Sequence, residues 1–160
     1  MTQEIANRTK THQAKIANLK TAAATRLATG DPPPATPLVM LAHGDSWFDY
    51  PLDGNSPSLF HTDITVQLTS MGTVNPHILN VSQWGDAATT EMSLPKQRLM
   101  IAALQDSANW LDGKPDAILF SGGGNDIAGE QFCIFLDYAS SGGSGLDSVR
   151  FTEALGMVEA

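Results

Sequence analysis

Cysteine, positive charge and long apolar runs are all scarce in this sequence. The single cysteine, Cys133, excludes an internal disulfide and a cysteine-rich zinc site, and its apolar neighbours predict an unreactive thiol in the core. No window approaches the roughly 20 consecutive apolar residues of a membrane span, so we expect none. An N-terminus without an apolar stretch predicts no signal peptide, and therefore a cytoplasmic protein.

Basic residues are fewer than acidic ones: the sequence has 9 lysines and arginines and 17 aspartates and glutamates, which gives a formal net charge of −8. Nucleic-acid binding needs clustered lysine and arginine, so this acidic body predicts no nucleic-acid partner. The first 30 residues, in contrast, carry a net positive charge. They contain one acidic residue, Glu4, and five basic residues: Arg8, Lys10, Lys15, Lys20 and Arg26. We interpret these bases as the solvated face of a helix, with contact to an anionic surface as the alternative.

Helical spacing of apolar residues runs through the N-terminal segment and ends before a proline-rich stretch. The stripe consists of Ile5, His12, Ile16, Leu19, Ala23 and Leu27. Gly30 predicts the end of this helix, and the three prolines after Asp31 cannot continue it. We therefore predict three parts: a basic amphipathic helix over 1–30, a rigid linker over 31–36 and a domain over 37–160.

Strand-like and helix-like segments alternate along the predicted domain. The pattern predicts strands at 37–42, 77–81 and 116–120, and helices at 63–71, 95–109 and from 147 onward. This alternation indicates right-handed crossovers and a parallel sheet, so we expect a three-layer α/β/α domain. Ligand sites in such sheets lie beyond the carboxyl ends of the strands. Each predicted strand is followed there by small polar residues, with the sequences HGDS, SQWGD and SGGGND.

Together these three segments resemble the conserved blocks of the SGNH (GDSL-type) hydrolase family. Gly44-Asp45-Ser46-Trp47 is similar to the nucleophile block, Trp84-Gly85-Asp86 to the second block, and Gly123-Gly124-Asn125-Asp126 to the asparagine block. The resemblance covers about Leu38 to Gly129 and implies a flavodoxin-like parallel sheet.

The resemblance also implies a role for three residues. Ser46 would be the nucleophile, and the backbone N–H groups of Ser46 and Gly85 would form an oxyanion hole with the side-chain amide of Asn125. Acyl transfer needs such fixed donors aimed at its developing charge. The alternatives are a helix-capping serine at 46, a plain loop glycine at 85 and a turn at Asn125 and Asp126.

The family's fourth block, an Asp-x-x-His that provides the general base, has no counterpart in this sequence. The histidines are His12, His43, His61 and His77, and none follows Asn125. We therefore expect a truncated chain, whose uncovered strand edge and apolar faces favour self-association. His43 is interpreted as a packing or hydrogen-bonding residue, and His61 is the one substitute base in view.

The sequence thus predicts a serine hydrolase that cleaves carboxylic esters of the lipase, esterase or acetyl-esterase type. Its partner would be a small ester or acylated substrate, and no metal or organic cofactor is implied. The alternative is a non-catalytic binding module that keeps the pocket but lacks the acid/base pair.

Two further groups of residues lie near Ser46. Asp45, Asp49 and Asp53 recur every four residues, but Pro51 and Gly54 break any helix there, so solvated loop carboxylates are preferred to a cation site. The aromatic residues could line an acyl or sugar pocket or pack in the core, and both readings stay open for Trp47, Phe48 and Tyr50.

Overall fold

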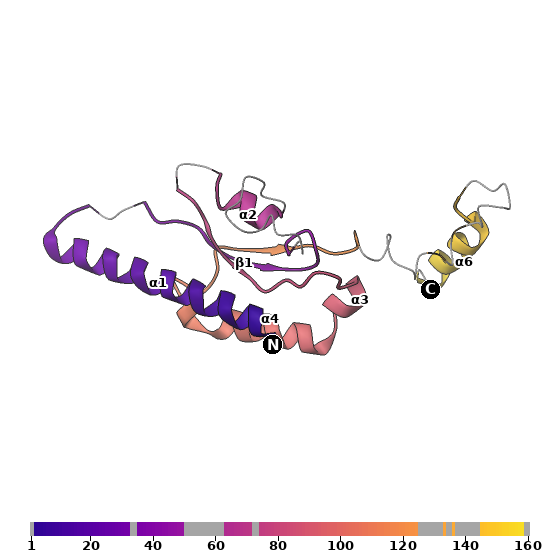
Figure 1. Ribbon diagram of the computed structural model, residues 1–160, viewed down its shortest axis with the longest axis horizontal. Coiled ribbons are helices and arrows are strands. Elements are labelled where there is room, and N and C mark those ends of the chain that lie inside the picture. Colours follow the sequence, from indigo (N-terminus) through magenta and orange to yellow (C-terminus); the bar gives the residue numbers. More distant parts are fainter. Residues whose placement is uncertain are drawn as a thin grey trace. The chain divides into compact units, whose positions relative to one another are not determined.

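The computed structural model describes residues 2–32, 35–49, 63–71, 74–124, 133, 136 and 145–158. The chain divides into two compact units, Met1–Gly122 and Gly123–Ala160 (Figure 1). The first unit is mixed α/β, with a small parallel sheet flanked by helices. The coarse fold class expected from the sequence is therefore confirmed for this unit.

Three parallel strands form the sheet, in the order β2-β1-β3. They are β1 (Val39–His43), β2 (His77–Asn80) and β3 (Ala117–Phe120). In the central register, Leu41 of β1 pairs with Leu79 of β2 and Ile118 of β3. The strands begin and end within two residues of the predicted ranges, because uninterrupted apolar runs mark them clearly.

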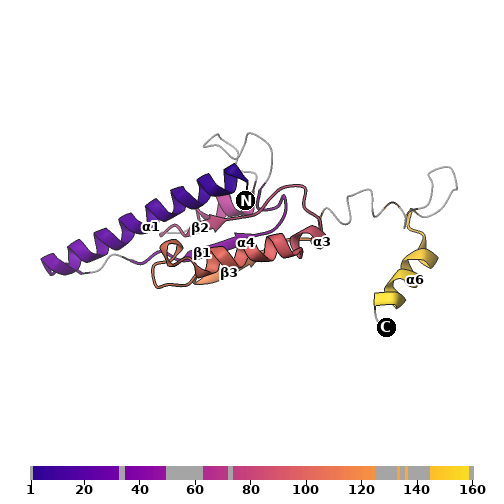
Figure 2. The same ribbon diagram turned by 90° about the horizontal axis from the view of Figure 1, so that it is seen from below.

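Helices lie on both faces of the sheet, with α1 and α4 on one face and α2 on the other (Figures 1 and 2). Their bounds are α1 (Gln3–Thr29), α2 (Ile64–Leu68), α3 (Ala88–Glu91), α4 (Leu94–Gln105) and the 3₁₀ turn η2 (Ser107–Asn109). The predicted helix over 95–109 stops at Gln105, because Asp106 leaves the helical conformation and its side chain caps the 3₁₀ turn through Ala108 N. The single turn α3 was not predicted.

Helix α1 is part of the folded unit. The Thr2 hydroxyl caps its start by accepting from Ile5 N at 3.3 Å, and Gly30 ends it in the left-handed conformation, at φ 75°, as predicted. Ile5 and Ile16 are buried, but Leu27 is 84% exposed. The predicted apolar stripe is thus buried only in its first part, because the far end of α1 extends past the sheet (Figure 1).

The hydrophobic core joins α1 and α4 to the first two strands. Its buried members are Ile5, Ile16, Val39, Leu41, Leu79, Val81, Ala103 and Trp110. Strand β3 contributes none of them, since Ile118 and Phe120 are 51% and 50% exposed at the edge of the described sheet. Burying one large apolar side chain contributes about 1.5–3 kcal/mol, and within the sheet this contribution comes from β1 and β2.

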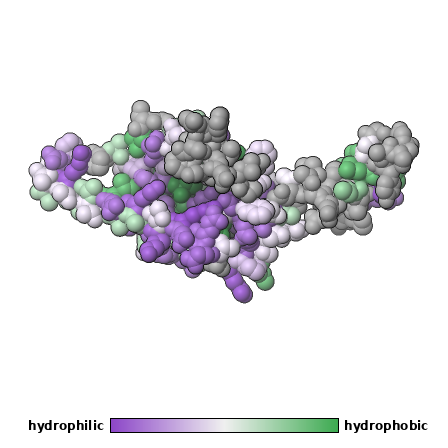
Figure 3. All heavy atoms as spheres, in the orientation of Figure 1, coloured by the Kyte–Doolittle hydropathy of each residue, from purple (hydrophilic) through white to green (hydrophobic). Residues whose placement is uncertain are grey.

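The surface over α1 and α4 is largely hydrophilic, as the lower central part of Figure 3 shows. Lys10, Lys15 and Lys20 of α1 are all exposed, which is compatible with a solvated face and with contact to an anionic partner. Among the residues with described structure, no helix has both the length and the apolarity needed to cross a membrane.

The second unit contains helix α6 (Ser148–Val158), which begins one residue after the predicted start. The Asp147 carboxylate caps it by accepting from Val149 N and Arg150 N, both at 3.1 Å. Cys133 is exposed, so the predicted core thiol is wrong. The buried members of the hydrophobic cluster, among the residues that the structure describes, belong to the first unit.

Candidate functional site

The carboxyl ends of the three strands meet at one edge of the sheet, where the predicted site segments begin. Gln83 N donates to Gly44 O at 3.0 Å, and Ser121 N donates to His43 O at 3.2 Å. The segments after β2 and β3 are therefore both bonded to the segment after β1, which lies between them. The prediction that three polar segments share one edge is confirmed as far as Gly122.

Asp45 and Ser121 are joined by two hydrogen bonds across this edge. Ser121 Oγ donates to Asp45 Oδ1 at 2.8 Å and accepts from Asp45 N at 3.1 Å. Asp45 Oδ1 also accepts from Trp47 N at 3.2 Å, and the Asp45 side chain is completely buried. This carboxylate therefore attaches the end of β3 to the turn that carries Ser46.

Gly44 is required by the close approach of β3. A Cβ atom at this position would lie 2.1 Å from Ser121 Oγ and 2.5 Å from Ser121 O. Those distances are far below van der Waals contact, so no other residue fits without moving one of the two segments. The glycine of the nucleophile-like block thus has a structural reason that is independent of any catalysis.

Ser46 lies half-buried in the turn after β1. The turn is closed by Asp45 O, which accepts from Phe48 N at 3.1 Å and Asp49 N at 3.2 Å. Neither the hydroxyl nor the backbone N–H of Ser46 is bonded to any residue whose position the structure describes. The side chain that accepts a backbone N–H in this turn is that of Asp45, which bonds Trp47 N. The alternative role of Ser46 as a helix cap is therefore not observed in this turn.

Gly85 lies in the neighbouring loop after β2, exposed and at φ 83°. An added Cβ would meet nothing within 4 Å, so glycine is favoured here by the left-handed backbone alone. The backbone N–H of the preceding residue, Trp84, donates to Asp49 Oδ2 at 3.2 Å, which connects this loop to the Ser46 turn. The Gly85 N–H has no acceptor within the described ranges.

Asp49 is buried and links the site to α1. Arg8 Nη2 lies 2.5 Å from Asp49 Oδ1 and 2.5 Å from Glu4 Oε1, and Arg8 Nη1 donates to Ser82 O at 3.2 Å. The prediction that Asp45 and Asp49 are solvated is therefore wrong. Backbone N–H groups and Arg8 supply the partners that allow both carboxylates to be buried.

The alternative of a cation site finds no support among the residues that can be placed. No group of three or more histidine, cysteine, aspartate or glutamate side chains there is arranged to hold a metal ion. The third carboxylate of the series, Asp53, lies outside the described residues.

His43 and Glu91 form a buried pair that sequence reasoning missed. His43 Nε2 lies 2.8 Å from Glu91 Oε2, which is an ion-pair distance although the carboxylate oxygen lacks hydrogen-bond alignment. Both residues are 2% exposed, and the His43 ring packs against Phe120 with centroids 5.6 Å apart. The interpretation of His43 as an interior packing residue is confirmed. Glu91 belongs to the single turn α3, which is too short to show a periodic pattern of apolar residues in the sequence.

Aromatic residues near Ser46 divide into one buried and two open side chains. Phe48 is 6% exposed and packs in the interior, whereas Trp47 is 59% exposed. Trp84 is 56% exposed and was not singled out from the sequence, although it stands beside Gly85 in the second block. Two indoles are therefore available to a ligand at this edge.

Several predicted residues lie outside the described ranges: Tyr50, His61, Asn125 and Asp126. The oxyanion role of the Asn125 amide and the substitute-base role of His61 remain predictions. Of the predicted catalytic residues, Ser46 and Gly85 are the two that the structure brings to a common edge.

Comparison with known proteins gives no match to a family model, a curated protein or a solved structure. The site has to be interpreted from its own geometry and chemistry, because an α/β fold by itself is compatible with many activities.

Proposed function

We propose that this protein is a serine hydrolase of carboxylic esters with an SGNH-like, three-layer flavodoxin-like fold. The observation that supports it most is the position of Ser46. Ser46 is half-buried at the carboxyl edge of a parallel sheet, and its hydroxyl is unbonded within the described structure. This edge is where parallel α/β sheets hold their ligands.

In the proposed reaction, Ser46 Oγ forms a bond to the ester carbonyl carbon while its proton passes to a base. The tetrahedral intermediate expels the alcohol, and water then releases the acid from the acyl-serine. The backbone N–H groups of Ser46 and Gly85 and the Asn125 amide are the proposed oxyanion donors. The first two have no internal acceptor among described residues, which suits this role. Losing one such donor costs about 100- to 1000-fold in rate.

The proposed reaction needs a general base to accept the Ser46 proton. The SGNH resemblance places it on an Asp-x-x-His segment, and the sequence contains no histidine after Asn125. His43 is close to Ser46 in the chain, but it is buried beside Glu91. Without a base, little serine alkoxide forms near neutral pH, so we expect slow turnover by this chain.

The proposed substrate is a small ester with an apolar acyl group or an acetylated sugar. Trp47 and Trp84 support it, because both indoles are more than half exposed on the two loops that carry Ser46 and Gly85. Aromatic faces bind acyl chains and sugar rings alike, so these side chains fit both substrate types.

Labelling with a fluorophosphonate probe, followed by mass spectrometry of peptides, tests the nucleophile. We expect the adduct on Ser46, and no adduct in Ser46→Ala. The exposed serine variant Ser70→Ala is a matched control and should label like the wild type. An adduct on another serine, with Ser46 unmodified, would contradict the proposal.

The second candidate is a non-catalytic module that binds esters at the same edge. One observation favours it. His43, the described histidine closest to Ser46 in the sequence, is buried and paired with Glu91, so it is not available as a general base. Titration with p-nitrophenyl butyrate, following tryptophan emission and nitrophenolate release together, separates the two functions. Quenching that is lost in Trp84→Phe, without turnover and without probe labelling, supports the binder.

A further inference from the structure

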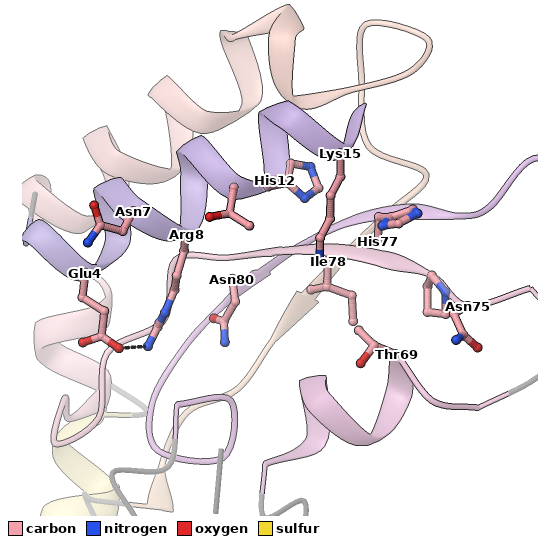
Figure 4. A pocket seen from close by; sticks show the side chains of 12 residues that line it. Glu4, Asn7, Arg8, His12, Lys15, Thr69, Asn75, His77, Ile78 and Asn80 are labelled. Atoms are coloured by element: carbon pink, nitrogen blue, oxygen red, sulfur yellow. Dashed lines mark hydrogen bonds and ion pairs between the residues drawn. The ribbon is translucent and has the colours of Figure 1, made fainter. Parts of the chain in front are cut away.

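A groove with a volume of about 580 Å³ lies between α1 and β2 (Figure 4). The residues that line this groove do not include Ser46 or Gly85, so it is distinct from the candidate site described above. Charged and imidazole side chains come from two elements, with Glu4, Arg8, His12 and Lys15 on α1 and His77 on β2. Thr11 and Asn75 add a hydroxyl and an amide to the lining.

The two ends of this groove differ in how their charges are balanced. Arg8 is neutralised by Glu4 and Asp49, each at 2.5 Å. The side chains of Lys15 and His77 form neither a hydrogen bond nor an ion pair with any residue in the described ranges, and the His77 backbone N–H donates to Leu38 O at 2.8 Å. One end of the groove therefore holds uncompensated positive charge in a chain whose net charge is −8.

His12, Lys15 and His77 lie close enough to influence one another. In Figure 4 the Lys15 side chain extends from α1 toward β2, with the two imidazole rings on either side. Burial lowers the pKa of His12, partly offset by its hydrogen bond to Asn109 O, and His77 and Lys15 lower it further. Burial lowers the pKa of His77 as well, and the Lys15 ammonium adds to that effect. A bound anion would relieve this mutual repulsion.

We propose that the end of the groove formed by His12, Lys15 and His77 binds a small soluble oxyanion, the phosphate or sulfate group of a small molecule. The ammonium supplies a point charge, and the Thr11 hydroxyl and Asn75 amide supply neutral donors that are unbonded among described residues. The site is independent of the proposed ester hydrolysis, because it uses none of its residues.

Binding at this site strengthens as the pH falls. The titratable and charged groups that face it are Glu4, Arg8, His12 and Lys15 from α1 and His77 from β2, and the bordering Thr69, Asn75 and Pro76 carry no charge. Protonation of the two imidazoles adds positive charge below their lowered pKa values, whereas sulfate keeps its charge over the same range. Oxyanion binding is thus coupled to proton uptake by His12 and His77.

Sulfate titration of the full chain, followed by NMR of the imidazole C–H signals, tests the site. Sodium chloride at matched ionic strength is the reference salt. We expect sulfate to raise the pKa of both His12 and His77, and to bind at least about fivefold more tightly near pH 5.5 than near pH 8. Lys15→Gln should weaken binding about tenfold, and Lys15→Arg should retain it.

Lys10→Gln is the matched control, since Lys10 is an exposed base on the same helix that does not border the groove. It should bind sulfate like the wild type. Equal losses in Lys10→Gln and Lys15→Gln would show general charge screening and overturn the proposal. It would also be overturned if sulfate and chloride moved the two histidine titrations equally. Both variants change exposed residues, so a urea midpoint close to that of the wild type confirms that they fold.

Discussion

Ser121 Oγ donates a hydrogen bond to Asp45 Oδ1 at 2.8 Å while accepting one from the backbone N–H of the same aspartate at 3.1 Å. One hydroxyl thus satisfies both the main chain and the side chain of a completely buried residue. The second carboxylate oxygen, Asp45 Oδ2, has no hydrogen-bond partner among the described residues. Because Asp45 precedes Ser46, the shape of the candidate site depends on this pair.

Ser121→Ala should lower the free energy of unfolding by about 1–3 kcal/mol, since it removes a donor from a buried carboxylate. Urea denaturation followed by far-UV circular dichroism measures it. In Ser70→Ala, the exposed hydroxyl is lost at a cost within about 0.5 kcal/mol. Equal losses in the two variants would show that the Asp45 contact contributes nothing to stability.

Gly44→Ala should destabilise the protein by more than about 3 kcal/mol or prevent folding, because its Cβ would overlap Ser121 Oγ and Ser121 O. Gly122→Ala is the matched control. Its Cβ would meet only Phe120, at an ordinary 3.6 Å, so we expect a small effect. Thermal melts of the two variants provide the comparison, and a stable Gly44→Ala protein would refute the close approach.

The buried pair His43–Glu91 can be tested with a double-mutant cycle. His43→Leu and Glu91→Leu should each cost about 3–5 kcal/mol, since each leaves the other group buried without its partner. The double variant should lose less than the sum of the single losses, by about 1 kcal/mol or more. Strict additivity in the free energies of unfolding would show that the two side chains are not coupled.

Stability should fall as the pH drops below the ordinary histidine pKa of 6.5, because burial lowers the pKa of His12 in the folded state. The unfolded chain then binds more protons than the folded chain, so acid favours unfolding. The contribution of neutral His12 is complete above pH 6.5 and is lost as the pH falls through the lowered pKa. Urea midpoints measured from about pH 7.5 to about pH 5 should show a smaller decline in His12→Gln than in the wild type. An unchanged slope would refute the role of His12.

Strand positions were predictable because β1, β2 and β3 are short apolar segments separated by polar turns. The end of α1 was equally clear, since Gly30 adopts the conformation that helices end on. The exposure of Cys133 and of Leu27 could not be predicted, because burial depends on whether another element covers a residue. An apolar neighbourhood in the chain does not reveal this.

The candidate site was predictable in part. Ser46 and Gly85 were identified as residues at strand ends, and the sheet brings their loops together. Glu91 was missed, and Asp49 was interpreted as solvated, because their partners His43 and Arg8 are distant in sequence. Contacts of this kind have no local signature.

The sequence alone determined the positions of the three strands, the end of α1 and the polar segments that follow the strands. Spacing of apolar residues and the backbone preferences of glycine and proline are local properties, so they can be read without a structure. The tertiary structure decided that Asp45 is buried against Ser121, that Arg8 reaches Asp49, and that His12, Lys15 and His77 share a groove. These relationships arise when the sheet and α1 assemble, because burial and electrostatic coupling depend on distances between residues far apart in the chain.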